Sequence, residues 1–158
     1  MKYIAWILIG TVLGAVGDWL FLQYNSGPVI PQQTQTILAY FNRSEPTDIV
    51  QVAVNRTISV TKAVATAAMQ ELLKGPTAAE KAEGLTTAIN AGTVLNYVKI
   101  ENGIATVDFN DQFDFQIGGS ARVRAIYQQI FKTLTQFSTI KSIQLTINNG
   151  ERPANLEP

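Results

Sequence analysis

The sequence predicts an α+β fold, in which a mixed sheet of about five strands is covered on one face by two main helices and preceded by an N-terminal membrane helix. Segments with apolar residues at every second position recur between residues 37 and 147 and indicate strands. Two segments with apolar residues three and four apart indicate helices, at residues 61–73 and 120–137. An apolar run opens the chain. We therefore expect the order ββ-α-ββ-α-β behind a membrane segment.

Residues 1–24 are predicted to be a membrane anchor or a signal peptide, and both alternatives stay open. An apolar run covers residues 3–17 behind the charge of Lys2, and reaches residue 22 if Asp18 is included. A spanning helix needs about 20 apolar residues, whereas the core of a cleavable signal has about 7–15. The uncleaved anchor is favoured by aromatic residues typical of a membrane interface, Trp19, Phe21 and Tyr24. The expected location is a single-pass position in the cytoplasmic membrane with the domain outside, or secretion after cleavage.

Residues 25–35 are uncharged and contain two prolines, which predicts a semi-extended linker. Strands are then predicted at residues 37–41 and 49–55. In the second strand alternate valines are expected to face the core, namely Val50, Val52 and Val54. Pro46 lies in the loop between them, because proline cannot donate to the ladder of a central strand.

Residues 61–73 combine alanines with apolar positions three and four apart, and predict a helix. Gly75 suits a left-handed cap at its C-terminus, and Pro76 prevents the helix from continuing. Thr77 and Glu80 match the T-x-x-E capping box that marks the start of a second, short helix.

Asn102-Gly103 between two alternating segments predicts a β-hairpin, because a type I′ turn needs positive φ at both central residues. Its strands are expected at residues 94–101 and 104–109. Two sets of side chains should share the inner face: Val94, Val98 and Ile100 on one strand, and Ala105, Val107 and Phe109 on the other.

The segment 120–137 carries an apolar stripe wide enough to cover a sheet. The opposite face is expected to be solvated and holds Arg122, Gln128, Gln129, Lys132 and Gln136. A last strand alternates at Ile143, Leu145 and Ile147 and ends at an Asn-Asn-Gly turn. Residues 151–158 are predicted to be a frayed tail.

Several short motifs follow one another in a recognisable order: LLKGPTAAE at 72–80, GLTTAINAGT at 84–93, VKIENGIATVDFN at 98–110, Gly-Ser at 119–120, TLTQF at 133–137, and a strand closing on Asn-Gly at 140–150. Together they resemble the GerMN domain of bacterial sporulation and spore-germination proteins. The resemblance covers residues 36–150. One departure is Asn90, where proline is common in the family, and we expect it to loosen that turn.

The resemblance implies an extracytoplasmic envelope domain associated with sporulation or germination, or with peptidoglycan in bacteria that do not sporulate. Domains of this kind resemble non-enzymatic interaction modules that help to assemble envelope complexes. The expected partners are envelope proteins and peptidoglycan, with the membrane contacted through residues 1–24, and self-association is left open. Nucleic acid is not expected, because 12 acidic and 12 basic residues leave no net positive charge.

The chain contains no cysteine and no histidine. Disulfides, thiolate nucleophiles, zinc–thiolate sites, histidine metal sites and Ser-His-Asp triads are therefore excluded. We assign no catalytic, metal-binding or cofactor-binding residue, expect no cofactor, and predict that the chain is not an enzyme.

The acidic cluster DFNDQFD contains Asp108, Asp111 and Asp114. As a calcium loop it lacks glycine at the sixth position and glutamate at the twelfth. As the carboxylate pair of a glycan-cleaving enzyme it would need an acid and a base about 5–9 Å apart across a sugar cleft. The favoured interpretation is that Asp108 and Asp111 accept hydrogen bonds from turn amides. A peptidoglycan hydrolase using these residues and a small-ligand receptor are the alternatives.

Glycines beside helix ends raise the question of phosphate binding. Gly118-Gly119-Ser120 precedes the main helix, where Arg122 and Arg124 could hold an anion. Neither this segment nor Gly75-Pro76 has the lysine spacing of a P-loop. Helix-boundary chemistry and a solvated helix face are the favoured interpretations.

Overall fold

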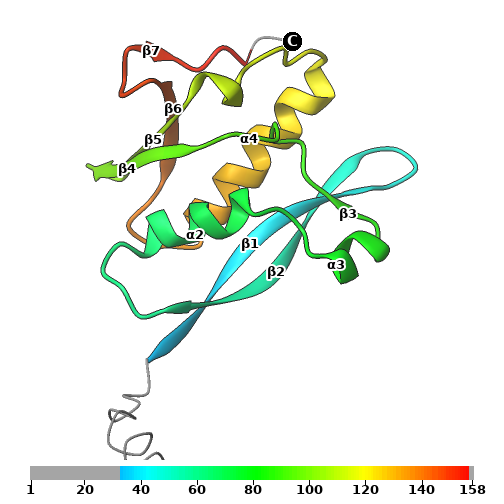
Figure 1. The fold of residues 1–158 in the computed structure, drawn as a ribbon, viewed down its shortest axis with the longest axis horizontal. Coiled ribbons are helices and arrows are strands. Elements are labelled where there is room, and N and C mark those ends of the chain that lie inside the picture. Colours follow the sequence, from blue (N-terminus) through cyan, green and yellow to red (C-terminus); the bar gives the residue numbers. More distant parts are fainter. Residues whose placement is uncertain (1–32, 157–158) are drawn as a thin grey trace, which may run out of the picture. The chain divides into compact units, whose positions relative to one another are not determined.

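The computed structural model describes residues 33–156, and the predictions made for the anchor at residues 1–24 and most of the linker lie outside them. Figure 1 shows the described part as two sheets with helices between and beside them. Among residues 33–156 no helix is both long enough and apolar enough to cross a membrane.

The first sheet is built on a long antiparallel hairpin of β1 (Thr34–Ser44) and β2 (Ile49–Ser59), which cross the lower part of Figure 1. The two-residue strand β3 (Leu85–Thr86) pairs with the end of β1, so the order is β2-β1-β3. Val52 and Val54 pack against the core as half-buried residues. Val50 was expected there too, but it is 39% exposed because β2 runs past the core at that end.

The second sheet is mixed, with the order β4-β5-β6-β7. β4 (Leu95–Glu101) and β5 (Ile104–Phe109) form the predicted hairpin, and Asn102 and Gly103 have φ of 51° and 82° as a type I′ turn requires. β6 (Ser142–Ile147) is parallel to β5, and β7 (Arg152–Pro153) is antiparallel to β6. The prediction of one sheet of about five strands is therefore wrong in its arrangement, since seven strands form two sheets within residues 33–156.

Three α-helices and one 3₁₀ turn complete the described chain: α2 (Val64–Leu73), α3 (Ala78–Ala82), η1 (Asp111–Phe113) and α4 (Ser120–Thr135). Gly75 follows α2 with φ of 76°, the predicted left-handed position. Thr77 and Glu80 form the predicted capping box at the start of α3.

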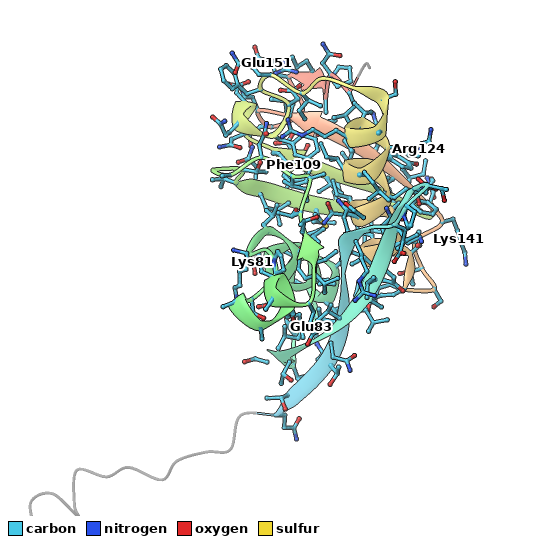
Figure 2. The ribbon with its side chains drawn as sticks, turned by 90° about the vertical axis from the view of Figure 1, so that its right-hand side faces the viewer. Lys81, Glu83, Phe109, Arg124, Lys141 and Glu151 are labelled. Atoms are coloured by element: carbon cyan, nitrogen blue, oxygen red, sulfur yellow. The ribbon has the colours of Figure 1, made fainter. Side chains whose placement is uncertain are left out.

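The core lies where α4 and α2 meet the two sheets. Fully buried phenylalanines come from three different elements, Phe41 on β1, Phe109 on β5 and Phe113 in η1. The rings of Phe109 and Phe113 stack with centroids 4.2 Å apart, and Figure 2 shows Phe109 in the interior of the domain. Val94 and Ile100 were expected on this inner side, but they are 55% and 42% exposed. Val94 precedes β4, and Ile100 lies near the end of β4, which is an edge strand.

Part of the polar side of α4 is not solvated, because Gln129 and Gln136 face the backbone of β1, whereas Gln128 and Lys132 remain partly exposed. Gln136 accepts a hydrogen bond from the Leu38 amide and donates one to the Leu38 carbonyl, at 2.8 and 2.7 Å. The backbone amide of Tyr40 donates to the Thr133 hydroxyl, and the Tyr40 carbonyl accepts from the side-chain amide of Gln129, both at 3.1 Å. These side chains, spaced four and three residues apart on α4, satisfy backbone groups of β1 at residues 38 and 40, whereas β3 pairs with β1 only at residues 42 and 43. The edge of β1 therefore needs no strand of the second sheet at this point.

The residues after the last predicted strand are ordered rather than frayed. β7 pairs with β6, and the amide of Ala154 donates to the carbonyl of Leu145 at 3.0 Å. Ala154 and Leu156 also pack against the core. The prediction of a frayed tail is wrong for residues 151–156, because a salt bridge described below holds them.

Candidate functional site

Asp108 is fully buried on β5, and both oxygens of its carboxylate accept hydrogen bonds from protein groups. Oδ1 accepts from Asn96 Nδ2 and from the Asn149 amide, both at 2.7 Å. Oδ2 accepts from the Thr146 hydroxyl at 2.6 Å and from the Gly150 amide at 2.8 Å. Burial by itself would raise the pKa of Asp108, but the four hydrogen bonds outweigh it and hold the pKa below its ordinary value.

Asp111 and Asp114 are joined by one arginine. Arg152 Nη1 lies 2.6 Å from Asp114 Oδ2, and Nη2 lies 3.1 Å from Asp114 Oδ1 and 3.3 Å from Asp111 Oδ1. The side chain of Asp114 is only 5% exposed, while that of Asp111 is 68% exposed. The Arg152 guanidinium holds the pKa of Asp114 below its usual range. The ion pairs of Arg152 with Asp111 and Asp114 therefore attach β7 to the loop after β5.

The structure thus separates the three aspartates that the sequence places together. Asp108 points at the turn that follows β6, whereas Asp111 and Asp114 point at Arg152. In the described part of the chain no group of three or more acidic residues is placed to hold a metal ion. The hydrogen bonds of Asp108 agree with its predicted turn-binding role. The partners of Asp111 are side chains, the amide group of Asn148 and the guanidinium of Arg152, rather than backbone amides.

The arginines that could have held an anion at the start of α4 have separate surroundings. Arg122 donates from Nη2 to Asn90 Oδ1 at 2.5 Å and from Nε to the Ala88 carbonyl at 3.3 Å. Arg124 is exposed and lies with Asp48 beside a small cavity of about 230 Å³, and Figure 2 shows it at the edge of the domain. Arg122 is therefore a structural contact that fixes the loop before β4.

Asn90, the departure from the family motif, tightens its turn instead of loosening it. Its side-chain amide donates to the carbonyls of Gln112 and Phe115 at 2.9 and 2.8 Å, while its Oδ1 accepts from Arg122. Proline has no side-chain donor or acceptor and could make none of these bonds. The expectation of a looser turn is wrong, because partners distant in the sequence hold the asparagine.

A groove of about 460 Å³ is lined entirely by residues between Leu72 and Thr93, the segment that carries the first two family motifs. We call it the 72–93 groove. Buried apolar residues form its base, including Leu72, Leu85 and Ile89. Lys74 and Lys81 are its charged residues. The family motifs mark this segment in the sequence, but the hollow forms only when α2, α3 and β3 pack.

A second surface lies along β4, whose outer edge has no hydrogen-bonded neighbour among residues 33–156. Beside it is an apolar groove of about 290 Å³ between β4 and the start of α2. We call this the β4 groove, and its apolar side chains include Val64, Val98, Ile100 and Phe137. Unpaired edge strands with apolar neighbours are common sites of strand addition by another chain.

Comparison with known proteins identifies the family. The model of the family described as Germane, sporulation and spore germination, matches residues 38–152. The chain belongs to this family. A solved structure of the tandem GerMN domains of the sporulation protein GerM from Bacillus subtilis is similar, with a TM-score of 0.63 and 27% identity over 82% of this chain. The chain spans about half of that protein, 47% of its length.

Two further structures agree on the fold. The first GerMN domain of Bacillus subtilis GerM matches 75% of this chain and 86% of that domain, with a TM-score of 0.57 and 27% identity. A candidate lipoprotein from Clostridium perfringens, 16% identical, shares the fold alone, with a TM-score of 0.50 over 77% of this chain and 80% of that one. No curated protein matches the chain. The family confirms the resemblance expected from the motifs, and with it the α+β class.

Proposed function

We propose that this GerMN domain is a non-enzymatic interaction module that works outside the cytoplasmic membrane in sporulation or germination complexes of the cell envelope. The unpaired edge of β4 beside the β4 groove is the observation that carries the proposal. An extended segment of a partner protein adds to this edge as a further strand, and its alternate side chains fill the groove. Residues 1–24 hold the domain at the membrane.

The geometry of β4 supports this mode of binding. Ile100 is paired with Ala105 and therefore points to the same side of the sheet as the core, yet it is 42% exposed. An added strand would cover it together with Val98 and Phe137. Lys99 and Glu101 pair with each other at 3.0 Å on the opposite side of β4. Their charges disfavour unspecific edge pairing without blocking the groove.

The surroundings of the aspartates favour interaction over hydrolysis. A glycan-cleaving acid needs a carboxyl group that reaches substrate. Asp108 has no exposed surface and all its bonds go to protein donors, and Asp114 is held by Arg152. Asp111 is exposed and lines a surface cavity together with Asp114, but the guanidinium of Arg152 in the same cavity pairs with both carboxylates.

Site-specific photocrosslinking in the full chain tests the proposal. A photoreactive phenylalanine analogue replaces Ile100 in one variant and Val50 in the control, since the two positions have matching exposures of 42% and 39% on edge strands of different sheets. We expect a defined adduct from position 100 in envelope membranes of sporulating cells and none from position 50. An adduct of twice the chain's mass would identify the partner as a second copy.

Equal labelling at both positions, or none at position 100, would contradict the role of the β4 edge. A separate incubation of the purified chain with peptidoglycan tests the non-enzymatic claim. Release of soluble glycan fragments that disappears in Asp111→Asn would overturn that claim and would identify the exposed aspartate as catalytic.

A further inference from the structure

The 72–93 groove has the composition of a small-ligand site. Its base is apolar and continuous with the core, while Thr86, Thr87 and Thr93 supply hydroxyl groups on its walls. Its volume of about 460 Å³ lies in the range of about 300–1,000 Å³ that is common for small-molecule pockets. This is the concave apolar pocket with a few polar groups that distinguishes a receptor from a purely protein-binding surface.

The groove is held open by contacts from elsewhere in the domain. Gln129 accepts a hydrogen bond from the Ala88 amide at 2.9 Å and donates to the Thr87 hydroxyl at 3.3 Å. Arg122 donates to the Ala88 carbonyl and to the side-chain oxygen of Asn90. The wall formed by residues 87–90 is therefore anchored to α4, so a ligand does not have to order it on binding.

The charges of the groove are all positive. No aspartate or glutamate is among its lining residues. Lys74 is paired with Glu71 at 2.5 Å, so its charge is largely compensated. Lys81 has no carboxylate within salt-bridge distance in the described part of the chain. Glu83 follows the end of α3, and Figure 2 shows Lys81 and Glu83 at separate places.

We propose that the 72–93 groove binds a small amphiphile with an alkyl-like body and one anionic group, a carboxylate or a phosphate. The apolar body lies over Leu73, Leu85 and Ile89, and the anion contacts the ammonium group of Lys81. Both lipid fragments and free metabolites can combine an apolar chain with a single phosphate or carboxylate, so either source would supply this chemistry. The inference goes beyond the interaction role and is independent of the β4 edge.

Hydrogen exchange measured by mass spectrometry on the full chain in lipid nanodiscs tests the site. The probes are octanoate and its uncharged counterpart octanamide, each titrated to about 10 mM. For a ligand of about ten non-hydrogen atoms we expect a Kd on the order of 1 mM for octanoate. Exchange should slow in peptides covering residues 84–93 and remain unchanged in those covering β2.

Two variants and one control test whether Lys81 binds the anion and whether the probes occupy the groove. Lys81→Gln should weaken octanoate about three- to fivefold and leave octanamide unchanged, as expected for one exposed ion pair. Ala91→Trp places a large side chain in the groove from an exposed lining position and should abolish protection by both probes. Lys62→Gln removes an exposed lysine outside this groove and should behave like the original chain.

Equal protection by octanoate and octanamide would overturn the anionic part of the proposal, and so would a loss of affinity in Lys62→Gln as large as in Lys81→Gln. Absence of protection at residues 84–93 by either probe would overturn the site itself. If octanoate binds as proposed, an octyl phosphate and short-chain phosphatidic acid compared in the same assay distinguish a soluble ligand from a lipid headgroup.

Discussion

Replacing Asp108 with asparagine should lower stability, although the change in shape is small. The amide oxygen of asparagine can still accept two hydrogen bonds, and the Thr146 hydroxyl can rotate to accept one from the new amide group. The Gly150 amide then loses its acceptor. Hydrogen bonds to a charged group are worth about 1.5–3 kcal/mol, against about 1 kcal/mol between neutral groups.

Asparagine is neutral and costs less to bury than a carboxylate, which offsets part of this loss. We therefore expect Asp108→Asn to reduce the free energy of unfolding by about 2 kcal/mol. For a domain of about 125 residues this corresponds to a fall in Tm of about 8 °C. Asp108→Ala leaves all four donors without their acceptor and should cost about 3–4 kcal/mol.

Chemical denaturation monitored by circular dichroism measures the effect, with Asp111→Asn as the matched control. That control removes the same charge three residues away from a side chain that is 68% exposed, and should change stability by less than about 0.5 kcal/mol. The pH dependence gives a second check. The folded-state pKa of Asp108 is lowered, so its contribution is present above its unfolded pKa of about 4 and is lost as the pH falls through the lower folded value.

As the pH falls below about 4, the free energy of unfolding should consequently decrease less steeply in Asp108→Asn than in the original chain. Equal stability of the two asparagine variants would refute the assignment of Asp108 as the acceptor that holds the 148–150 turn. A fully folded Asp108→Asn that loses only a peptidoglycan-cleaving activity would refute it more strongly, because the residue would then act on substrate.

Three further predictions follow from long-range contacts. Gln129→Leu should lower the free energy of unfolding by about 3 kcal/mol, because it removes the partner of several buried polar groups, whereas Gln128→Leu on the same helix should change it by less than about 0.5 kcal/mol; denaturant titration separates them. The salt bridge of Glu80 with Arg56 lowers the pKa of Glu80 to about 2, so it stabilises the fold above pH 4.5 and is progressively lost between pH 4.5 and 2. After allowance for solvent screening we expect this contribution to be about 1–2 kcal/mol, and a pH titration of Glu80→Gln that retains the full acid sensitivity would contradict it. Arg152→Ala should raise hydrogen exchange in residues 152–156 severalfold with little change in global stability, and unchanged exchange would show that β7 does not depend on this ion pair.

The elements that could be predicted from the sequence are those with local causes. The Asn102-Gly103 turn, the Gly75 cap and the Thr77–Glu80 capping box all appear where predicted, because each depends on residues at most a few positions apart. The apolar stripe of α4 is buried at Ile126, Ile130 and Leu134 for the same reason, since its period is a property of the helix alone. The order of the family motifs was sufficient to indicate the family.

Only the tertiary structure decided which polar residues become interior. Gln129 is indistinguishable from Gln128 in the sequence, yet it is fully buried because β1 lies against that side of α4 and needs its donors and acceptors. Asp108 looked like part of an acidic cluster, but a turn about forty residues later in the chain supplies two of its four donors. The 72–93 groove is lined by one stretch of chain, but its wall at residues 87–90 is fixed by Arg122 and Gln129 of α4, and the β4 edge is free because β5 is the one strand that pairs with β4 in the described part of the chain. Local chemistry therefore determined the turns, caps and family of this protein, whereas the partners of its backbone edges and buried polar groups were set by contacts that no short stretch of sequence contains.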